Sequence, residues 1–228
     1  YPGIIYRYGK AVHSPQMLSY AAYLYAKEKA NPRIIEGKDI FRAFENMRFE
    51  PELKQVEPKL VRQRSTWYPQ TQFCYMTNDQ GFFFAAKGGY NAESHNHNDA
   101  GTFSLYVNNV PMLKDAGVGT YTRQTFSDER YSIWTMQSDY HNVPRINGAS
   151  QPYGRAYKAQ QVIFDSAKAT LSMELSGAYG EAAAVKSWKR TYTLLPTNGL
   201  RMEDVFQLST LKEPNALHFL TWAQPDLS

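Results

Sequence analysis

The first quarter of the chain has hydrophobic residues at helical spacing. Ser14 and Pro15 have the character of a helix N-cap and of a first helical residue. The residues that follow carry an apolar stripe through Leu18, Ala21, Ala22, Leu24 and Tyr25. This pattern predicts a helix over residues 14–30.

A second, shorter helical pattern covers residues 38–47. Its apolar face consists of Ile40, Phe41 and Phe44. Pro51 and Pro58 then break the periodicity, because proline lacks the backbone N–H that a helix uses. We therefore expect a linker over residues 48–64.

From Ser65 onwards the pattern changes to short runs of aromatic and β-branched residues separated by turn sequences. Such a pattern is typical of an antiparallel β-sandwich. The expected strands cover residues 72–77, 82–86, 102–107, 110–113, 160–164, 170–175, 187–195, 200–208 and 216–221. The sequence thus predicts a mainly β fold, with a helical segment and linker over residues 1–64 and a β-sandwich over residues 65–228.

Turn residues connect several of these runs. The turns that predict hairpins are Asn78-Asp79-Gln80-Gly81, Asn108-Asn109 and Asn147-Gly148. Thr197-Asn198-Gly199 predicts a further turn between two of the longest strands.

The composition excludes several classes of protein. The 228 residues are 43% hydrophobic and 20% charged, as in ordinary globular domains. No apolar run approaches the roughly 20 residues that a membrane-spanning helix needs. Lys and Arg are scattered and the net charge is +4, which favours an anionic partner only weakly and indicates no nucleic-acid binding. The chain begins at Tyr1 without an initiator Met, so we expect it to be part of a longer protein, and the lack of a signal-peptide pattern indicates that a signal peptide is absent or already removed.

Histidines are concentrated in the segment over residues 88–103. His95 and His97, two of the five histidines in the chain, lie one residue apart. In an extended chain residues i and i+2 point to the same side, so both imidazoles can face one site. They would serve there as two metal ligands, or as one ligand and one proton-transfer group.

A carboxylate and a further histidine are expected near this pair. The turn at Asn108-Asn109 folds Asp115 back towards His97, and His141 opens the next strand-like run. The single cysteine excludes a thiolate zinc cluster, whereas two His and one Asp with an open fourth position suit Zn²⁺. A simpler interpretation is a polar loop whose histidines are exposed or bonded to the backbone.

The order of these motifs resembles a known family. Ser94-His95-Asn96-His97-Asn98-Asp99-Ala100-Gly101-Thr102-Phe103, then Lys114-Asp115-Ala116-Gly117, then His141-Asn142 is similar to the heparinase II/III family of polysaccharide lyases. The resemblance covers about residues 88–151. It implies an N-terminal α/α toroid followed by antiparallel β-sandwich sheets, with the active site in the cleft between them. The helices of residues 14–47 would then be the end of the toroid.

The resemblance also implies roles for single residues. His97, Asp115 and His141 would hold a mainly structural Zn²⁺, and His95 would face the cleft as a catalytic or carboxylate-contacting group. Other candidates in the cleft are Tyr131 as an acid or base, Asn96 and Arg123 as substrate contacts, and Tyr121. His13 and His218 are expected to be structural.

Lyases of this family cleave uronate polysaccharides by β-elimination. They neutralise the uronate carboxylate, remove the C5 proton and protonate the leaving oxygen. The resemblance therefore implies an anionic glycosaminoglycan or alginate-like partner and a periplasmic or secreted location. Because the toroid's own catalytic residues would lie upstream of Tyr1, we expect this chain to be inactive alone.

Two other interpretations remain. A cupin-like metalloenzyme also uses His-x-His on a strand, but it expects a Glu a few residues later, where Asp99 stands here. A non-catalytic carbohydrate-binding or scaffolding β-sandwich with a structural metal would also suit the 14% aromatic content. An upstream toroid that carries a Tyr and an Asn or His would favour the lyase.

Overall fold

The computed structural model describes residues 2–28, 39–60, 62–197 and 199–224. The chain divides into two compact units, residues 1–62 and residues 63–228. Within the described residues, no helix has the length and hydrophobicity required to cross a membrane.

The first unit consists of helices α1 (Pro2–Ala11), α2 (Pro15–Glu28) and α3 (Ile40–Leu53). The Ser14 hydroxyl accepts a hydrogen bond from the Met17 N–H at 3.3 Å, which confirms the predicted start of α2. The core of this unit consists of Tyr6, Ala21, Ala22, Phe49 and Leu53. Helix α1 was not predicted, and the predicted helical positions 29–30 and 38 lie outside the described residues.

Helix α3 differs from its prediction because it continues through Pro51 to Leu53. A proline inside a helix costs about 3 kcal/mol. Burial of Phe49 and Leu53 offsets this cost, since each large apolar side chain contributes about 1.5–3 kcal/mol. The expected apolar face at residues 40–44 is instead exposed, with Phe41 at 79%.

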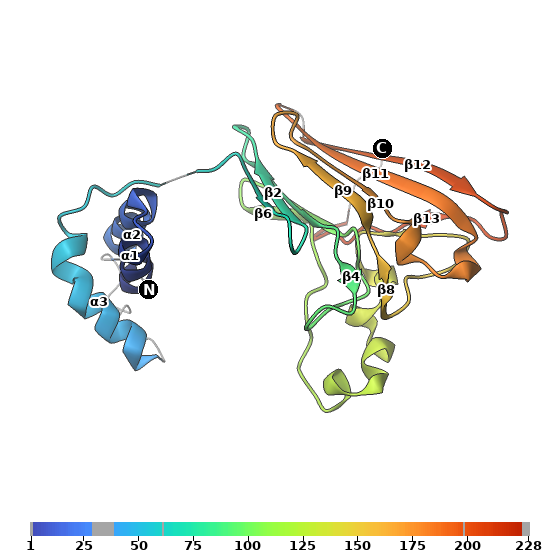
Figure 1. Ribbon diagram of the computed structural model, residues 1–228, viewed down its shortest axis with the longest axis horizontal. Coiled ribbons are helices and arrows are strands. Elements are labelled where there is room, and N and C mark those ends of the chain that lie inside the picture. The colour runs from blue at the N-terminus through green and yellow to red at the C-terminus, as the bar shows by residue number, and fades with distance from the viewer. Residues whose placement is uncertain (1, 29–38, 61, 198, 225–228) are drawn as a thin grey trace. The chain divides into compact units, whose positions relative to one another are not determined.

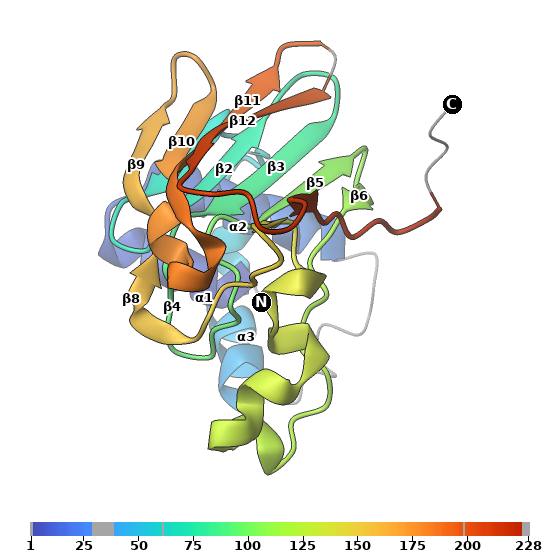
Figure 2. The same ribbon diagram turned by 90° about the vertical axis from the view of Figure 1, so that its right-hand side faces the viewer.

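The second unit contains two large antiparallel sheets (Figures 1 and 2). The five-stranded sheet has the order β1 (Ser65–Tyr68), β2 (Phe73–Thr77), β3 (Phe82–Lys87), β5 (Phe103–Val107) and β6 (Val110–Leu113). The four-stranded sheet has the order β12 (Gly199–Leu208), β11 (Val185–Leu195), β10 (Thr170–Glu174) and β9 (Gln160–Asp165). Two smaller pairs join β13 (Ala216–Leu217) to β7 (Pro144–Arg145) and β4 (Tyr90–Asn91) to β8 (Gly154–Lys158).

Aromatic side chains from both large sheets meet in one core. Phe84 and Phe103 come from the five-stranded sheet, and their ring centroids lie 5.1 and 5.0 Å from that of Tyr192 on β11. All three side chains are buried, as the inward positions of alternating strands should be. This packing confirms the mainly β fold and the antiparallel sandwich.

Two of the three predicted hairpins are confirmed. β2 pairs with β3, and β5 pairs with β6 across Asn108 and Asn109, which both have positive φ as a two-residue type I′ turn requires. The third is wrong: the Asn147-Gly148 turn closes a single bridge, because β7 pairs with β13 instead. Asn198, in the fourth predicted turn, lies outside the described residues.

A long segment between β6 and β7 was not predicted to have regular structure. It contains the 3₁₀ helices η2 (Gln124–Phe126), η3 (Asp128–Ser132), η4 (Trp134–Met136) and η5 (Ser138–Tyr140). In Figure 1 this yellow-green segment extends from one end of the sandwich. It returns to the sheets at His141, directly after η5.

Candidate metal centre

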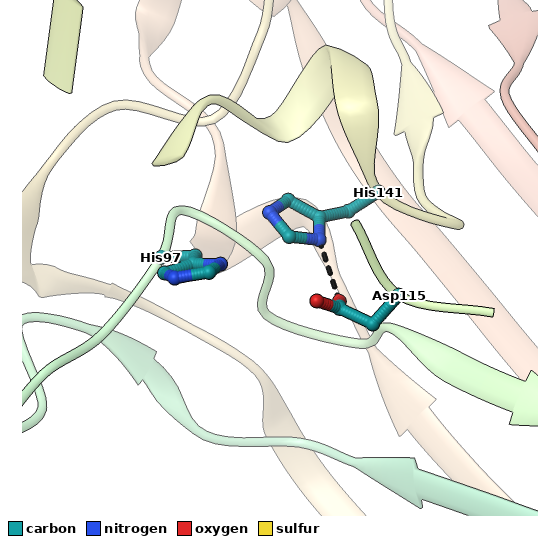
Figure 3. A group of neighbouring side chains, drawn as sticks. All are labelled: His97, Asp115 and His141. Atoms are coloured by element: carbon teal, nitrogen blue, oxygen red, sulfur yellow. Dashed lines mark hydrogen bonds and ion pairs between the residues drawn. The ribbon is translucent and has the colours of Figure 1, made fainter. Parts of the chain in front are cut away.

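Three side chains from distant parts of the sequence converge at one end of the sandwich (Figure 3). His97 lies in the turn after β4, Asp115 follows β6 and His141 follows η5. One ligand atom from each lies within 4.8 Å of the other two. His97 and His141 are buried, whereas the Asp115 side chain is 36% exposed. The structure therefore brings together the three predicted ligands.

Hydrogen bonds fix the orientation of His141. Its Nε2 lies 3.1 Å from the Thr135 carbonyl oxygen, which can only accept, so Nε2 carries a proton. Its Nδ1 lies 2.8 Å from Asp115 Oδ2. Nδ1 therefore either donates a proton to Asp115 or presents a lone pair to a metal. The Thr135 carbonyl is the kind of partner that holds a metal-binding imidazole in one tautomer.

The three side chains shift one another's pKa values. Burial alone would lower the pKa of His141, but the hydrogen bond and the charge of Asp115 outweigh burial and raise it. For Asp115, burial opposes ionisation, but the hydrogen bond and charge of His141 outweigh it and lower the pKa. Burial, together with the nearby His141, lowers the pKa of His97, which keeps its imidazole neutral.

The chemistry of this donor set fits Zn²⁺. Two imidazole nitrogens and one carboxylate oxygen leave a coordination position open, and zinc accepts both kinds of ligand. The Gly117 N–H donates to Asp115 Oδ1 at 2.7 Å, so Oδ2 is the oxygen that faces His141. His141 and Asp115 thus both have the outer hydrogen bonds that usually support metal ligands.

The turn that carries the two histidines differs from the extended geometry expected for it. His95 has a φ of 57°, in the left-handed region that non-glycine residues rarely adopt. The prediction that two imidazoles share one side of a strand is therefore wrong. His97 is buried in the ligand group, whereas His95 is exposed.

Both histidines nevertheless line one pocket of about 410 Å³, together with Asp115. Its other walls include Phe73, Tyr75, Ala85, Lys87 and Asp99. The Lys87 ammonium lies 2.7 Å from Asp99 Oδ1. Burial would lower the pKa of Lys87, but the charges and hydrogen bonds of Asp99 and Glu93 together outweigh it and raise the pKa.

Asn96 is committed to contacts within the protein. Its side-chain oxygen accepts from the Tyr131 hydroxyl at 2.8 Å, and its amide donates to the His97 carbonyl at 2.9 Å. Its backbone carbonyl accepts from two nitrogens of Arg130, at 2.9 and 3.3 Å. Arg130 was not predicted, although it stands next to the candidate Tyr131, and it holds the turn between the two histidines.

The remaining candidates lie beside this turn. Burial raises the pKa of Tyr131, whose ring stacks on Tyr153 with centroids 4.4 Å apart. Tyr121 is exposed and its ring centroid lies 6.5 Å from that of His95. Arg123 is exposed at the start of η2, and among the described residues neither it nor Tyr131 lines the pocket.

Gln151 is a further residue that was not predicted. Its side-chain amide donates to the Ala100 carbonyl at 2.9 Å and accepts from the Ala100 N–H at 3.0 Å. It also accepts from the Asn91 amide at 3.0 Å. These bonds anchor the histidine-bearing turn to the chain after β7.

Comparison with known proteins places these features in a family. The family described as heparinase II/III-like, C-terminal, matches residues 61–225. The heparan sulfate lyase HepC from Pedobacter heparinus is 15% identical with a TM-score of 0.52, over 83% of this chain and 28% of that one. A heparinase III structure is 18% identical with a TM-score of 0.52, over 78% of this chain and 29% of that one. A heparinase III gene product with methylated lysines is also 18% identical, with a TM-score of 0.54, over 75% and 27% of the two chains.

At these identities the likeness concerns the fold. The chain spans less than a third of the length of these solved structures. A search of curated proteins gave no match.

Proposed function

Because this chain belongs to the heparinase II/III-like family, we propose that it forms the metal-binding β-domain side of the active-site cleft of a polysaccharide lyase. Its substrate would be an anionic uronate polysaccharide, cleaved by β-elimination. One observation carries this proposal: the exposed imidazole of His95 lines the same pocket as His97 and Asp115 of the ligand group. An upstream toroid of the same polypeptide would form the other side, in a periplasmic or secreted protein.

His97, Asp115 and His141 would hold a Zn²⁺ ion. A bound Zn²⁺ would supply a cross-link between three distant chain segments. The low pKa of His97 leaves its nitrogen lone pair available, and Asp115 brings a negative charge. His97 and Asp115 line the pocket, so a bound ion would fix part of its wall, and the reaction itself would depend on other groups.

His95 is the residue of this chain best placed for the reaction. It is exposed and lines the pocket, whereas the neighbouring His97 is buried. A protonated His95 would neutralise a uronate carboxylate, which makes the C5 proton more acidic, and a neutral His95 would accept a proton. Burial raises the pKa of Tyr131 and keeps its hydroxyl protonated, which disfavours Tyr131 as the base.

The test uses the full-length protein and a panel of heparan-type chains, other glycosaminoglycans and alginate. We expect products with a conjugated double bond, measured by ultraviolet absorbance, whereas this chain alone should release none. His95→Ala should lower turnover by about 100-fold or more, the loss typical of a positioned proton-transfer or charge-stabilising group. His13→Ala is the matched control, since His13 is an exposed histidine of the helical unit.

Two outcomes would contradict the proposal. Saturated sugar products would indicate a hydrolase. Binding of a uronate polymer without turnover would favour the non-catalytic carbohydrate-binding domain.

A further inference from the structure

A buried polar network connects the ligand group to the four-stranded sheet. At its centre is Arg190 on β11, whose side chain is 1% exposed. Its Nε and one terminal nitrogen donate to the two carboxylate oxygens of Asp204 at 2.7 and 2.6 Å. This paired geometry fixes the plane of the guanidinium and leaves its other terminal nitrogen to make different contacts.

That nitrogen connects to two segments that carry candidate metal ligands, one directly and the other through Tyr192. It donates to the Asn142 carbonyl at 3.1 Å and to the Tyr192 hydroxyl at 3.4 Å. The Tyr192 hydroxyl in turn donates to the Gly101 carbonyl at 2.8 Å. Asn142 directly follows His141, and Gly101 ends the segment that begins with His97.

The Asn142 side chain extends the connection to the third ligand. Its amide nitrogen donates to the carbonyls of Phe103 and Lys114, at 2.7 and 3.1 Å. Its side-chain oxygen accepts from the Leu220 N–H at 2.8 Å. Lys114 directly precedes Asp115, so one buried amide joins the backbones next to His141 and Asp115.

Stability alone does not explain this arrangement. A buried ion pair is expensive to desolvate, and its replacement by apolar residues of similar volume is often neutral or stabilising. We propose that Arg190, held by Asp204, is a positioning residue for the metal centre and acts through Asn142 and Tyr192. It sets the separation of the three ligand-bearing segments. This inference rests on the proposed metal centre.

Two variants test the proposal in the whole chain. Arg190→Met with Asp204→Leu replaces the ion pair by apolar side chains, and Tyr192→Phe removes a single hydroxyl. The measurements are Zn²⁺ affinity by competition with a chelator, the absorption spectrum of the Co²⁺-loaded protein, and the melting temperature without metal. Tyr6→Phe is the matched control, because it removes a buried tyrosine hydroxyl, bonded to Glu52, from the helical unit.

We expect Zn²⁺ affinity to fall by about tenfold or more in both variants, as for other partners that orient metal ligands. The Co²⁺ spectrum should also change, whereas the control should keep the affinity and spectrum of the parent. A purely structural role would lower the melting temperature and leave affinity and spectrum unchanged, which would overturn the proposal. If the double variant does not fold, Tyr192→Phe decides.

The parent chain separates this inference from the proposal beneath it. If the parent chain binds no Zn²⁺, both the proposed metal centre and the positioning role are refuted. A parent that binds Zn²⁺, with folded variants that bind it equally well, ends only the positioning role.

Discussion

Removal of the metal should lower the melting temperature of the β-unit, and His97→Ala should have the same effect. The physical reason is that the ligand group forms only when the turn after β4, the end of β6 and the segment after η5 meet. A metal that binds this folded arrangement in preference to the unfolded chain stabilises it by mass action. Loss of the metal should therefore lower the melting temperature as well as the metal content.

The size of the effect follows from the binding equilibrium. At a free metal concentration about 100 times the dissociation constant, binding stabilises the folded state by about 2.7 kcal/mol. For a unit of this size, 1 kcal/mol shifts the melting temperature by about 2–4 °C, so we expect a shift of about 5–10 °C. Any binding of metal to the unfolded chain would reduce this value.

The assay compares melting curves with saturating Zn²⁺ and with a chelator. Elemental analysis should give about one zinc per parent chain and none for His97→Ala, which should melt alike under both conditions. His218→Ala is a control within the same unit, because His218 lies outside the ligand group. A parent whose melting temperature does not respond to Zn²⁺, or a His97→Ala variant that keeps both metal and response, would refute the reasoning.

Two other measurements test the protonation of the ligand group and the hydrogen bonds that Arg130 makes beside it. Zn²⁺ uptake should release protons and weaken as the pH falls, because the proton between His141 and Asp115 must leave; calorimetry in buffers of different ionisation enthalpy measures this. In the metal-free protein the pH dependence of stability has the opposite direction. Because the folded-state pKa of His141 is raised, protonation of His141 stabilises the fold below about pH 6.5, and this stabilisation is lost as the pH rises through the folded-state pKa. Arg130→Ala should lower the free energy of unfolding by about 1–3 kcal/mol in urea titrations, because it leaves the Asn96 carbonyl without its donor; an unchanged value, equal to that of exposed Arg123→Ala, would contradict this role.

Most of the sandwich could be predicted because its strands alternate between buried and less buried positions. β10 and β11 show this alternation almost without interruption. The end of α3 could not be predicted, since burial of Phe49 and Leu53 by other helices overrides the local effect of Pro51. The third hairpin failed for a similar reason, because the partner of β7 comes from a distant part of the chain.

The proximity of two members of the ligand group, His97 and Asp115, could be predicted from one hairpin. The Asn108-Asn109 turn fixes the register of β5 and β6, and that register returns Asp115 to the start of β5 near His97. The outer hydrogen bonds could not be predicted in this way. Arg130 and Arg190 reach the site across 34 and 48 residues of sequence, and nothing in their local pattern marks these contacts.

The different exposure of the two neighbouring histidines is associated with an unusual backbone conformation at His95. In a regular strand His95 and His97 would face the same side, and both imidazoles could reach one metal. The left-handed conformation of His95 costs of order 1 kcal/mol or more and persists only where the surroundings enforce it. Arg130 and Tyr131 supply that enforcement, because they hold the backbone and the side chain of Asn96. The same two contacts therefore keep one imidazole buried among the ligands and the other exposed in the pocket.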